Sequence, residues 1–326
     1  MIEHPRVGIV VIGRNEGERL ISALRSVIAP GHDIVYVDSN SNDDSVAAAR
    51  RAGAKVITLD MSKPFSAARA RNAGYAALSE YPQKCEFVQF MDGDCELDRS
   101  WIEKAALFLR SNPNAAIACG RRRERFPERS IYNRLCDIEW DTPVGQTQEC
   151  GGDFLVRSEA FSSVAGFRDA LIAGEEPELC ARLRGKGWTI WRIDAEMTRH
   201  DANMLHWWQW WRRSVRCGYC YAALYRLHGN GQDKLKRRNL ISSLFWGAAL
   251  PIAIVSAALF YPPLIAGLGV YFIQIVRIGL QRSNGVRNGA SYGASLMIAK
   301  FAECVGIGKF ILAELKGTTQ PLIEYK

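Results

Sequence analysis

Residues 87–94, Phe87-Val88-Gln89-Phe90-Met91-Asp92-Gly93-Asp94, are an apolar run that ends in two aspartates separated by one glycine. The apolar part predicts a buried strand that carries Asp92 and Asp94 to a crevice, with no lysine or arginine beside them until Arg99. Two carboxylates at this spacing can share a Mg²⁺ or Mn²⁺ ion whose remaining ligands are substrate phosphate oxygens. Asp and Gly also favour turns, so an ordinary turn is the alternative. The cation-site hypothesis predicts that the chain handles a phosphorylated donor.

The size and the cysteines of the chain limit its class. Its 326 residues, with a net charge of +8, suffice for one large domain or for one domain plus an appendage. The N-terminal residues 1–6 are polar and precede only a short apolar run, so we expect the N-terminal part to remain cytoplasmic. The nine cysteines form no disulfide framework, and Cys217 and Cys220 are a CxxC pair without a second pair at zinc spacing. Reduced thiols in a cytosolic compartment are expected.

Residues 7–201 alternate between strand-like and helix-like patterns. This alternation predicts an α/β fold, with a mostly parallel, Rossmann-like sheet and helices on both faces. In such sheets, ligands bind at the carboxyl ends of the strands. The loops at 14–16, 38–39 and 92–94 follow such ends, so we expect them to converge on one crevice. The predicted strands are 7–12, 34–37, 55–59 and 87–92, with a strand-like stretch at 188–193, and the predicted helices are 15–27, 46–52, 67–78 and 100–109.

Two stretches offer helix caps. Ser41, Asn42 and Asp43 precede the predicted helix at 46–52 and can provide its N-cap. Residues 100–103, Ser-Trp-Ile-Glu, match the capping-box pattern at the start of the predicted helix at 100–109.

After about residue 204 the composition changes. Residues 205–213 combine four tryptophans with two arginines, which is typical of a membrane–water boundary. The alternative is that these aromatic residues cover the sheet domain. The basic cluster 234–238, Lys-Leu-Lys-Arg-Arg, could bind nucleic acid. Because it directly precedes apolar sequence, the cytoplasmic flank of a membrane span is favoured, and no nucleic-acid partner is expected.

A membrane hairpin is predicted next. Residues 240–261 contain no charge and are long enough to span a bilayer, residues 262–263 are Pro-Pro, and residues 264–276 are again apolar. Basic residues lie on both outer flanks and none in the turn, so both ends are expected on the cytoplasmic side. The shorter second arm is either a tilted span or a re-entrant segment. The stretch at 291–315 carries charges among apolar residues and predicts an amphipathic helix on the membrane surface. The predicted segments are therefore a sheet domain at 1–203, an interfacial segment at 204–239, a membrane hairpin at 240–280 and an amphipathic helix and tail at 281–326.

A set of motifs occurs in fixed order along the first two-thirds of the chain. The motifs are Val10-Val11-Ile12-Gly13-Arg14-Asn15-Glu16, Val37-Asp38-Ser39-Asn40-Ser41-Asn42-Asp43, Ala70-Arg71-Asn72-Ala73-Gly74, Met91-Asp92-Gly93-Asp94, Gly151-Gly152-Asp153-Phe154-Leu155-Val156-Arg157 and Gly174-Glu175-Glu176-Pro177-Glu178-Leu179-Cys180-Ala181-Arg182-Leu183. This set resembles the family 2 glycosyltransferases of the GT-A fold, in particular membrane-associated bacterial members, which use nucleotide-diphosphate sugars.

The resemblance implies roles for individual residues. Asp92 and Asp94 look like the DxD motif that holds Mg²⁺ or Mn²⁺ against the donor diphosphate, and His200 is a candidate third ligand, although a lone histidine is more often structural. Arg71 can also be an ordinary exposed helix residue. The residues that the resemblance assigns to nucleotide-sugar binding are Arg14, Asn15, Glu16, Asp38, Arg71, Asn72, Asp92, Gly152, Asp153 and Arg212.

Glu175 and Glu176 resemble the acidic pair that provides the catalytic base of an inverting transfer. The usual pair is Glu-Asp. The longer second side chain leaves open which glutamate reaches the acceptor hydroxyl, and its position in the pair favours Glu176. The alternative is two exposed carboxylates that stabilise a helix N-terminus.

The resemblance implies a metal-dependent, inverting glycosyltransferase at the cytoplasmic face of the plasma membrane. A UDP-sugar donor is favoured, and the acceptor would be a lipid-linked saccharide or a glycan in envelope polysaccharide or glycolipid synthesis. One alternative is a processive polysaccharide synthase, although Arg213 replaces the tryptophan of the QxxRW signature that begins at Gln209. The other alternative is a catalytically inactive scaffold that binds a nucleotide sugar. No GxGxxG follows the first strand and no Walker A loop is present, which argues against a dinucleotide oxidoreductase or a P-loop enzyme.

Overall fold

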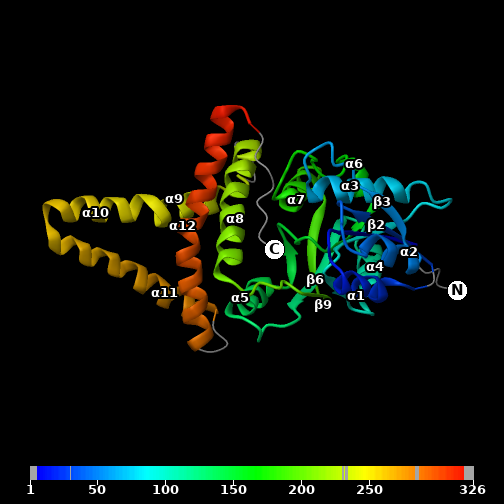
Figure 1. The fold of residues 1–326 in the computed structure, drawn as a ribbon, viewed down its shortest axis with the longest axis horizontal. Coiled ribbons are helices and arrows are strands. Elements are labelled where there is room, and N and C mark those ends of the chain that lie inside the picture. Colours follow the sequence, from blue (N-terminus) through cyan, green and yellow to red (C-terminus); the bar gives the residue numbers. More distant parts are fainter. Residues whose placement is uncertain (1–5, 30, 230, 232–233, 283–285, 319–326) are drawn as a thin grey trace. The chain divides into compact units, whose positions relative to one another are not determined.

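The computed structural model describes residues 6–29, 31–229, 231, 234–282 and 286–318 (Figure 1). The chain divides into two compact units, Met1–Asn203 and Met204–Lys326.

The first unit is built on a single mixed sheet. Its strand order is β3-β2-β1-β4-β8-β6-β9-β5, and β7 also pairs with β9. The strands are β1 Val7–Gly13, β2 His32–Asp38, β3 Lys55–Thr58, β4 Phe87–Asp92, β5 Cys95–Leu97, β6 Ala115–Glu124, β7 Gly145–Thr147, β8 Phe154–Arg157 and β9 Thr189–His200.

The first four strands are parallel, as predicted, and so are β6 and β9. In contrast, β8, β5 and β7 run antiparallel to their neighbours, so the sheet is mixed rather than mostly parallel. The antiparallel strands β5, β7 and β8 are only three or four residues long and were not among the predicted strands, so the sequence pattern did not reveal this half of the sheet.

Seven helices accompany this sheet in the described part of the first unit. Figure 1 shows α3 on one face of the sheet and α1 and α2 on the other, as the predicted α/β fold requires. Gly74 of α3 allows close packing, because a Cβ atom there would lie 2.3 Å from Cγ1 of Val10 on β1. The helices are α1 Glu18–Val27, α2 Ser45–Arg51, α3 Ala67–Leu78, α4 Trp101–Ser111, α5 Ile131–Trp140, α6 Ser158–Ser163 and α7 Glu175–Gly185.

Neither of the two helix caps forms as predicted. At α2 the N-cap residue is Asp44, which makes no side-chain cap bond, so none of the three predicted residues is the N-cap; Asp43, one residue earlier, accepts a hydrogen bond at its Oδ1 from the backbone N–H of Ser45. The capping box at 100–103 is wrong. The Ser100 hydroxyl makes no cap bond to α4, because it donates instead to Oδ1 of Asp98 at 2.7 Å.

The second unit is helical in its described residues. Helix α12 packs along α8, and glycines let the two backbones approach closely (Figure 1). A Cβ atom at Gly218 of α8 would lie 2.0 Å from the carbonyl oxygen of Glu303, and one at Gly306 would lie 1.9 Å from that of Val215. The elements are α8 Trp207–His228, α9 Arg237–Leu244, the π-helical η1 Phe245–Ala249, α10 Leu250–Phe260, the 3₁₀-helical η2 Pro262–Leu268, α11 Gly269–Arg282 and α12 Val286–Lys316.

The helix predicted at 291–315 forms as part of α12, but two of its charges do not face water. Lys300 and Glu303 are mostly buried and form an ion pair at 2.7 Å, and Ser243 of α9 also bonds to Glu303. Burial of this pair follows from the close packing of α12, which the sequence pattern alone does not reveal.

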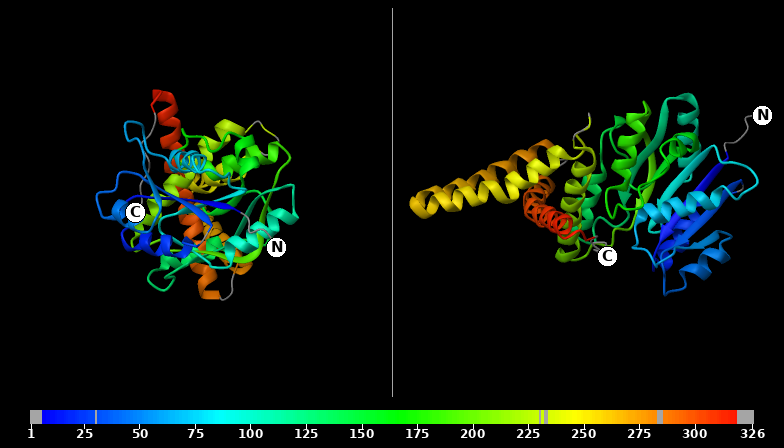
Figure 2. Two further views of the ribbon diagram at one scale, coloured as in Figure 1. Left: turned by 90° about the vertical axis from the view of Figure 1, so that its right-hand side faces the viewer. Right: turned by 90° about the horizontal axis from the view of Figure 1, so that it is seen from above.

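Two stretches in the described part of this unit, Arg237–Phe260 and Pro262–Gln281, are long and apolar enough to cross a membrane. They correspond to the two predicted arms, and the second is longer than its apolar run of 264–276 suggested. Figure 1 shows α10 and α11 as the two arms of a V joined through η2, and Figure 2 shows the same pair from two further sides. Leu259, Phe260 and Phe272 are strongly exposed, with Phe260 at 91%.

Candidate active site

The loops after β1 and β2 are bound to each other. The backbone N–H of Asn15 donates to the Ser41 hydroxyl at 2.9 Å, and that of Asn42 donates to Oδ1 of Asn15 at 2.8 Å. Gly13 lies opposite Asp38 and Ile12 lies opposite Asp92 in the sheet register, so β1, β2 and β4 end at one edge. The predicted convergence of these loops is therefore confirmed.

The side chains of these loops differ in exposure. Asp38 is buried, where it accepts bonds from the Tyr36 hydroxyl at 3.1 Å and the Ser41 backbone at 2.9 Å. Glu16 pairs with Arg19 at 2.8 Å, and Arg14 is exposed. Donor contacts by Asp38, Asn15, Glu16 and Arg14 stay predictions, and Arg14 and Asn15 are the exposed residues among them.

Gly93 has a steric reason to be glycine. Its backbone N–H donates to the Ile12 carbonyl at 2.8 Å, and a Cβ atom would lie 3.2 Å from both that oxygen and Cγ of Glu16. The Asp-Gly-Asp turn therefore fits against the end of β1 through Gly93, with Asp92 before this glycine and Asp94 after it.

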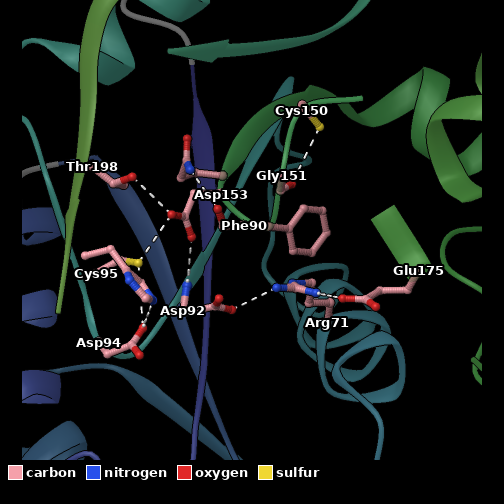
Figure 3. A network of polar contacts seen from close by, with 12 residues as sticks. Arg71, Phe90, Asp92, Asp94, Cys95, Cys150, Gly151, Asp153, Glu175 and Thr198 are labelled. Atoms are coloured by element: carbon pink, nitrogen blue, oxygen red, sulfur yellow. Dashed lines mark hydrogen bonds and ion pairs between the residues drawn. The ribbon is translucent and has the colours of Figure 1, made fainter. Parts of the chain in front are cut away.

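Arg71 joins three elements at this edge (Figure 3). From α3 its guanidinium reaches Asp92 at the end of β4, with Nη2 2.8 Å from Oδ1, and Glu175 at the start of α7, with Nη1 2.7 Å from Oε1. Its side chain is only 3% exposed, so the alternative of an ordinary surface arginine is excluded. Burial acts to lower the pKa of Arg71, but Asp92 and Glu175 raise it, and the net pKa is above the usual value. Arg71 is therefore a buried cation bound to both predicted acidic motifs.

The backbone of Gly152 lies close to the ion pair of Arg71 and Asp92. A Cβ atom there would lie 3.0 Å from Nη2 of Arg71 and 3.3 Å from Oδ2 of Asp92. Any side chain at position 152 would press on the two charged groups, which is consistent with the predicted role of this glycine near the donor.

Asp153 occupies the centre of a buried polar network (Figure 3). One oxygen accepts from the backbone N–H of Asp92 at 3.1 Å, and the other lies 2.7 Å from Nη2 of Arg122 and accepts from the Thr198 hydroxyl at 3.0 Å. The side chain is fully buried. This arrangement argues against the predicted direct contact with a donor and indicates that Asp153 positions the end of β4.

Asp94, Cys95 and His200 offer ligand atoms that all lie within 4.8 Å of one another. Nε2 of His200 is 3.3 Å from Oδ1 of Asp94, while its buried Nδ1 has no hydrogen-bond partner. Burial and the Arg122 charge lower the pKa of His200 to about 4, so the imidazole is neutral near pH 7. Carboxylate oxygens suit Mg²⁺ and Mn²⁺, and a neutral imidazole is a common metal ligand. Asp94 and His200 therefore fit the predicted cation site, whereas Asp92 does not belong to this group in the described part of the chain.

Glu175 and Glu176 have different surroundings. Glu175 pairs with Arg71, whereas Oε1 of Glu176 accepts from the backbone N–H of Cys150 at 2.6 Å and from the thiols of Cys150 and Cys180 at 3.2 and 3.0 Å. Burial, followed by the nearby Glu149 charge, raises the pKa of Glu176. The side chain of Glu175 is 12% exposed and the residue Glu176 is 7% exposed, so the alternative of two exposed carboxylates is excluded.

Asn72 is a predicted donor contact that does not join this network. The Asn72 amide donates to the Phe167 carbonyl at 2.8 Å and to Oδ1 of Asp169 at 2.7 Å, so it holds the loop before α7. Arg212 is an exposed residue of α8 in the second unit, and its contact with a donor stays a prediction. Gln209, the first residue of the partial QxxRW signature, caps α8 by accepting from the backbone N–H groups of Leu205 and His206.

Sequence reasoning missed several residues of the site. Arg122 binds Asp153, and the Trp140 ring contacts both the Arg122 guanidinium and the His200 ring. Three consecutive arginines at 121–123 on β6 were a signal, because side chains alternate along a strand and only one face turns toward Asp153. Cys150 and Trp140 carry no comparable signal in the sequence.

The chain was compared with known proteins. The pre-mycofactocin glycosyltransferase of Mycobacterium tuberculosis is 26% identical over 217 residues, which are 61% of this chain and 43% of the relative, so the match spans less than half of that protein. A mannosyltransferase from Pyrobaculum calidifontis, solved with GDP-Man and Mn²⁺, superposes with a TM-score of 0.61 at 19% identity, covering 92% of this chain and 86% of that one. Glucosyl-3-phosphoglycerate synthase from Mycobacterium tuberculosis, solved with Mn²⁺, UDP and glucosyl-3-phosphoglycerate, covers 68% of this chain and 80% of its own at 18% identity, with a TM-score of 0.49.

The likeness to the mannosyltransferase shows a shared fold, and the predicted GT-A architecture is confirmed. Residues 8–172, just over half of the chain, match the model of Glycosyl transferase family 2. The chain therefore belongs to glycosyl transferase family 2.

Proposed function

We propose that this protein is a membrane-attached glycosyltransferase that moves one sugar from a nucleoside-diphosphate donor to a lipid-linked acceptor. The observation that carries the proposal is the Arg71 bridge, which connects Asp92 of the predicted donor motif with Glu175 of the predicted acidic pair. A buried arginine bound to both motifs is expected where donor phosphates and an acceptor hydroxyl meet. Family membership supports this assignment.

Asp94 and His200 would hold Mg²⁺ or Mn²⁺, with Asp92 as a further ligand on the side of Arg71. When bound, this cation neutralises negative charge on the departing nucleoside diphosphate. The Arg71 side chain supplies a fixed positive charge beside Asp92. The base of the nucleotide is open: a UDP-sugar is the first donor to test, and the GDP-Man complex of the mannosyltransferase makes a GDP-sugar the second.

We assign the catalytic base to Glu176 and a positioning role to Glu175. In the proposed step the acceptor oxygen attacks the anomeric carbon, its proton passes to the Glu176 carboxylate, and the bond from sugar to diphosphate breaks. One displacement of this kind inverts the anomeric configuration. A carboxylate with a raised pKa is the stronger base, whereas the carboxylate of Glu175 is already bound to the guanidinium of Arg71.

The second unit supports a lipid acceptor. Its two apolar stretches would cross the membrane as a hairpin with basic residues on the cytoplasmic side. An open pocket of about 530 Å³ lies at the start of the first stretch, and no described carboxylate pairs with its three cationic side chains. Basic pockets next to membrane spans bind lipid head-group phosphates. The pocket is lined by Lys234, Arg237, Arg238, Ile241, Ser242, Phe245 and Trp246.

The proposal is tested by sugar transfer in membranes that contain the full chain. We expect Asp94→Ala and Glu176→Gln each to lose at least about 100-fold of the transfer rate. Asp44→Asn removes an exposed carboxylate of the same unit and should leave the rate unchanged. Wild-type rates in both site variants would refute the assigned roles, a polymeric product would favour a processive synthase, and nucleotide binding without turnover would favour a scaffold.

A further inference from the structure

Cys150, Glu176 and Cys180 form a compact cluster of possible metal ligands at the start of α7. The two sulfur atoms are 3.8 Å apart, and Oε1 of Glu176 lies 3.2 Å from one and 3.0 Å from the other. Glu176 and Cys180 are four residues apart on α7 and therefore share a helix face, while Cys150 comes from the loop before Gly151. All three side chains converge without a lysine or arginine among the bonds to Glu176.

The separation of the two sulfur atoms matches that of a tetrahedral zinc site. Zinc binds thiolate sulfur at about 2.3 Å in tetrahedral geometry, which puts two sulfur ligands roughly 3.8 Å apart. Carboxylate oxygen is an established third ligand at about 2.0 to 2.2 Å, which puts it roughly 3.6 Å from each sulfur. Oε1 of Glu176 is closer than that to both sulfur atoms, so the carboxylate would have to move outward by about half an ångström to close the site around a single ion.

We propose that Cys150, Cys180 and Glu176 bind a thiophilic divalent cation, with Zn²⁺ as the reference ion, and that this binding inhibits sugar transfer. Two zinc–sulfur bonds and one zinc–oxygen bond form, the two thiol protons leave to solvent, and no group is oxidised or reduced. The bound Glu176 carboxylate can then no longer accept the acceptor proton. The inhibition rests on the proposed role of Glu176, whereas the metal site does not.

The chemistry of the ligands separates this cluster from the donor-site cation. Sulfur ligands select zinc and other soft ions, whereas carboxylate oxygens suit Mg²⁺ and Mn²⁺. Asp94 and His200 contribute oxygen and nitrogen, and the cluster at α7 contributes two sulfur atoms. Excess Mn²⁺ should therefore fill the donor site without displacing zinc from the cluster.

Burial explains how the cluster is stable without metal. Burial and the adjoining Cys180 and Glu176 keep the pKa of Cys150 well above its usual value, and burial raises that of Cys180 to about 12. Both thiols are consequently protonated near pH 7 and donate to Glu176. A soft cation replaces those protons with stronger bonds, so the cluster would exchange between a hydrogen-bonded and a metal-bound form.

Cadmium titration of the purified, reduced chain tests the site, because cadmium–thiolate bonds absorb in the ultraviolet. We expect the Cys150→Ser/Cys180→Ser variant to lose the absorbance of two cadmium–sulfur bonds relative to the wild type. Cys217→Ser/Cys220→Ser, which removes the CxxC pair of α8, is the matched control and should retain it. Unchanged absorbance in the Cys150→Ser/Cys180→Ser variant would overturn the site.

A second measurement needs no variant. Zinc should slow alkylation of Cys150 and Cys180 in the wild-type chain by at least about 10-fold, as read from the modified peptides by mass spectrometry, and leave that of Cys85 unchanged. Cys85 is a partly exposed thiol outside the cluster. Equal labelling of Cys150 and Cys180 with and without zinc would contradict metal binding there.

The inhibition is tested as the ratio of transfer rates with and without zinc, in excess Mn²⁺. We expect a loss of at least about 10-fold in the wild type and a ratio near one in the Cys150→Ser/Cys180→Ser variant. Zinc protection of both thiols without any loss of transfer would overturn the inhibition and Glu176 as the base together. Absence of zinc protection in an enzyme that depends on Glu176 would overturn the metal site alone.

Discussion

The two units of the chain differ most in where they gather buried charge and in how much apolar surface they expose. The first unit buries Arg71, Asp153 and Glu176, and each of them has polar partners at one edge of a sheet. The second unit leaves large apolar side chains such as Leu259 and Phe260 almost fully exposed along α10. Buried charge is costly in a water-soluble domain, and extended apolar surface is costly in water.

This difference indicates where each unit meets its ligand. A cluster of paired buried charges at the carboxyl ends of parallel strands is expected of a binding site for a polar donor. An apolar helical hairpin with a basic pocket at its start is expected of a membrane anchor that handles lipid.

Removing Arg71 should have the largest effect on stability. Arg71→Ala leaves Asp92 and Glu175 without their shared cation, and loss of one partner of a buried ion pair costs about 3–5 kcal/mol. Arg51→Ala is the control, since its pair with Asp44 is exposed and is worth at most about 1 kcal/mol. Chemical denaturation of the full chain in detergent measures both. Similar losses in the two variants would mean that the Arg71 bridge is not an important part of the fold.

A charge on the hairpin should impair membrane insertion. Ile252→Arg introduces arginine near the middle of the first apolar stretch, which disfavours insertion by about 2.5–3.5 kcal/mol. Leu107→Arg is the matched control on α4 of the first unit, because Leu107 is as exposed as Ile252. Carbonate extraction of membranes reads out the retained fraction. If both variants were retained equally, the two exposed apolar positions would not differ as the contrast requires.

Gly74→Ala should destabilise the first unit moderately. The added methyl group would overlap Val10, and overpacking of this kind costs about 1–3 kcal/mol. Gly185→Ala is the control, since it ends α7 with nothing within 4 Å and should be neutral or stabilise by about 0.5 kcal/mol. The same denaturation assay distinguishes them, and a stable Gly74→Ala chain would show that α3 can shift away from β1.

Glu149→Gln should give the smallest effect, on the pH profile of transfer in zinc-free buffer. Glu176 must be ionised to accept a proton, so transfer is lost as pH falls through its raised pKa. Burial is the main cause of that rise and the Glu149 charge is the next. Removing this charge lowers the pKa of Glu176, so the acid limb should move to lower pH. The exposed Glu159→Gln variant should not move it, and a shift to higher pH in Glu149→Gln would contradict Glu176 as the base.

Much of the sheet edge at which β1, β2 and β4 end could be predicted from the sequence. Parallel strands end at one edge, so Asp38 and Asp92 were predictable neighbours once their strands were identified, and the register places them on either side of β1. The two apolar arms could be predicted equally well, because stretches able to cross a membrane are recognised by their length and composition.

Contacts between residues far apart in the chain could not be predicted from the sequence in the same way. The full burial of Asp153 depends on Arg122 and Thr198, which come from β6 and β9 and meet it only in the folded sheet. The Glu176–Cys180 spacing was visible in the sequence, but Cys150 joins it through the path of a loop. The sequence pattern predicted Lys300 and Glu303 on the solvent-exposed face of a helix. The close packing of α12 buries them instead.

Every proposed role in the first unit depends on the binding of a nucleoside diphosphate through a divalent cation at Asp94. Calorimetric titration of the full chain with UDP and with GDP, in Mn²⁺ and after complete chelation, tests this binding for the wild type and for Asp94→Ala. We expect one nucleotide to bind in Mn²⁺, and its affinity to fall at least about 10-fold after chelation and in Asp94→Ala. Equal affinity with and without the cation would contradict this role of the cation.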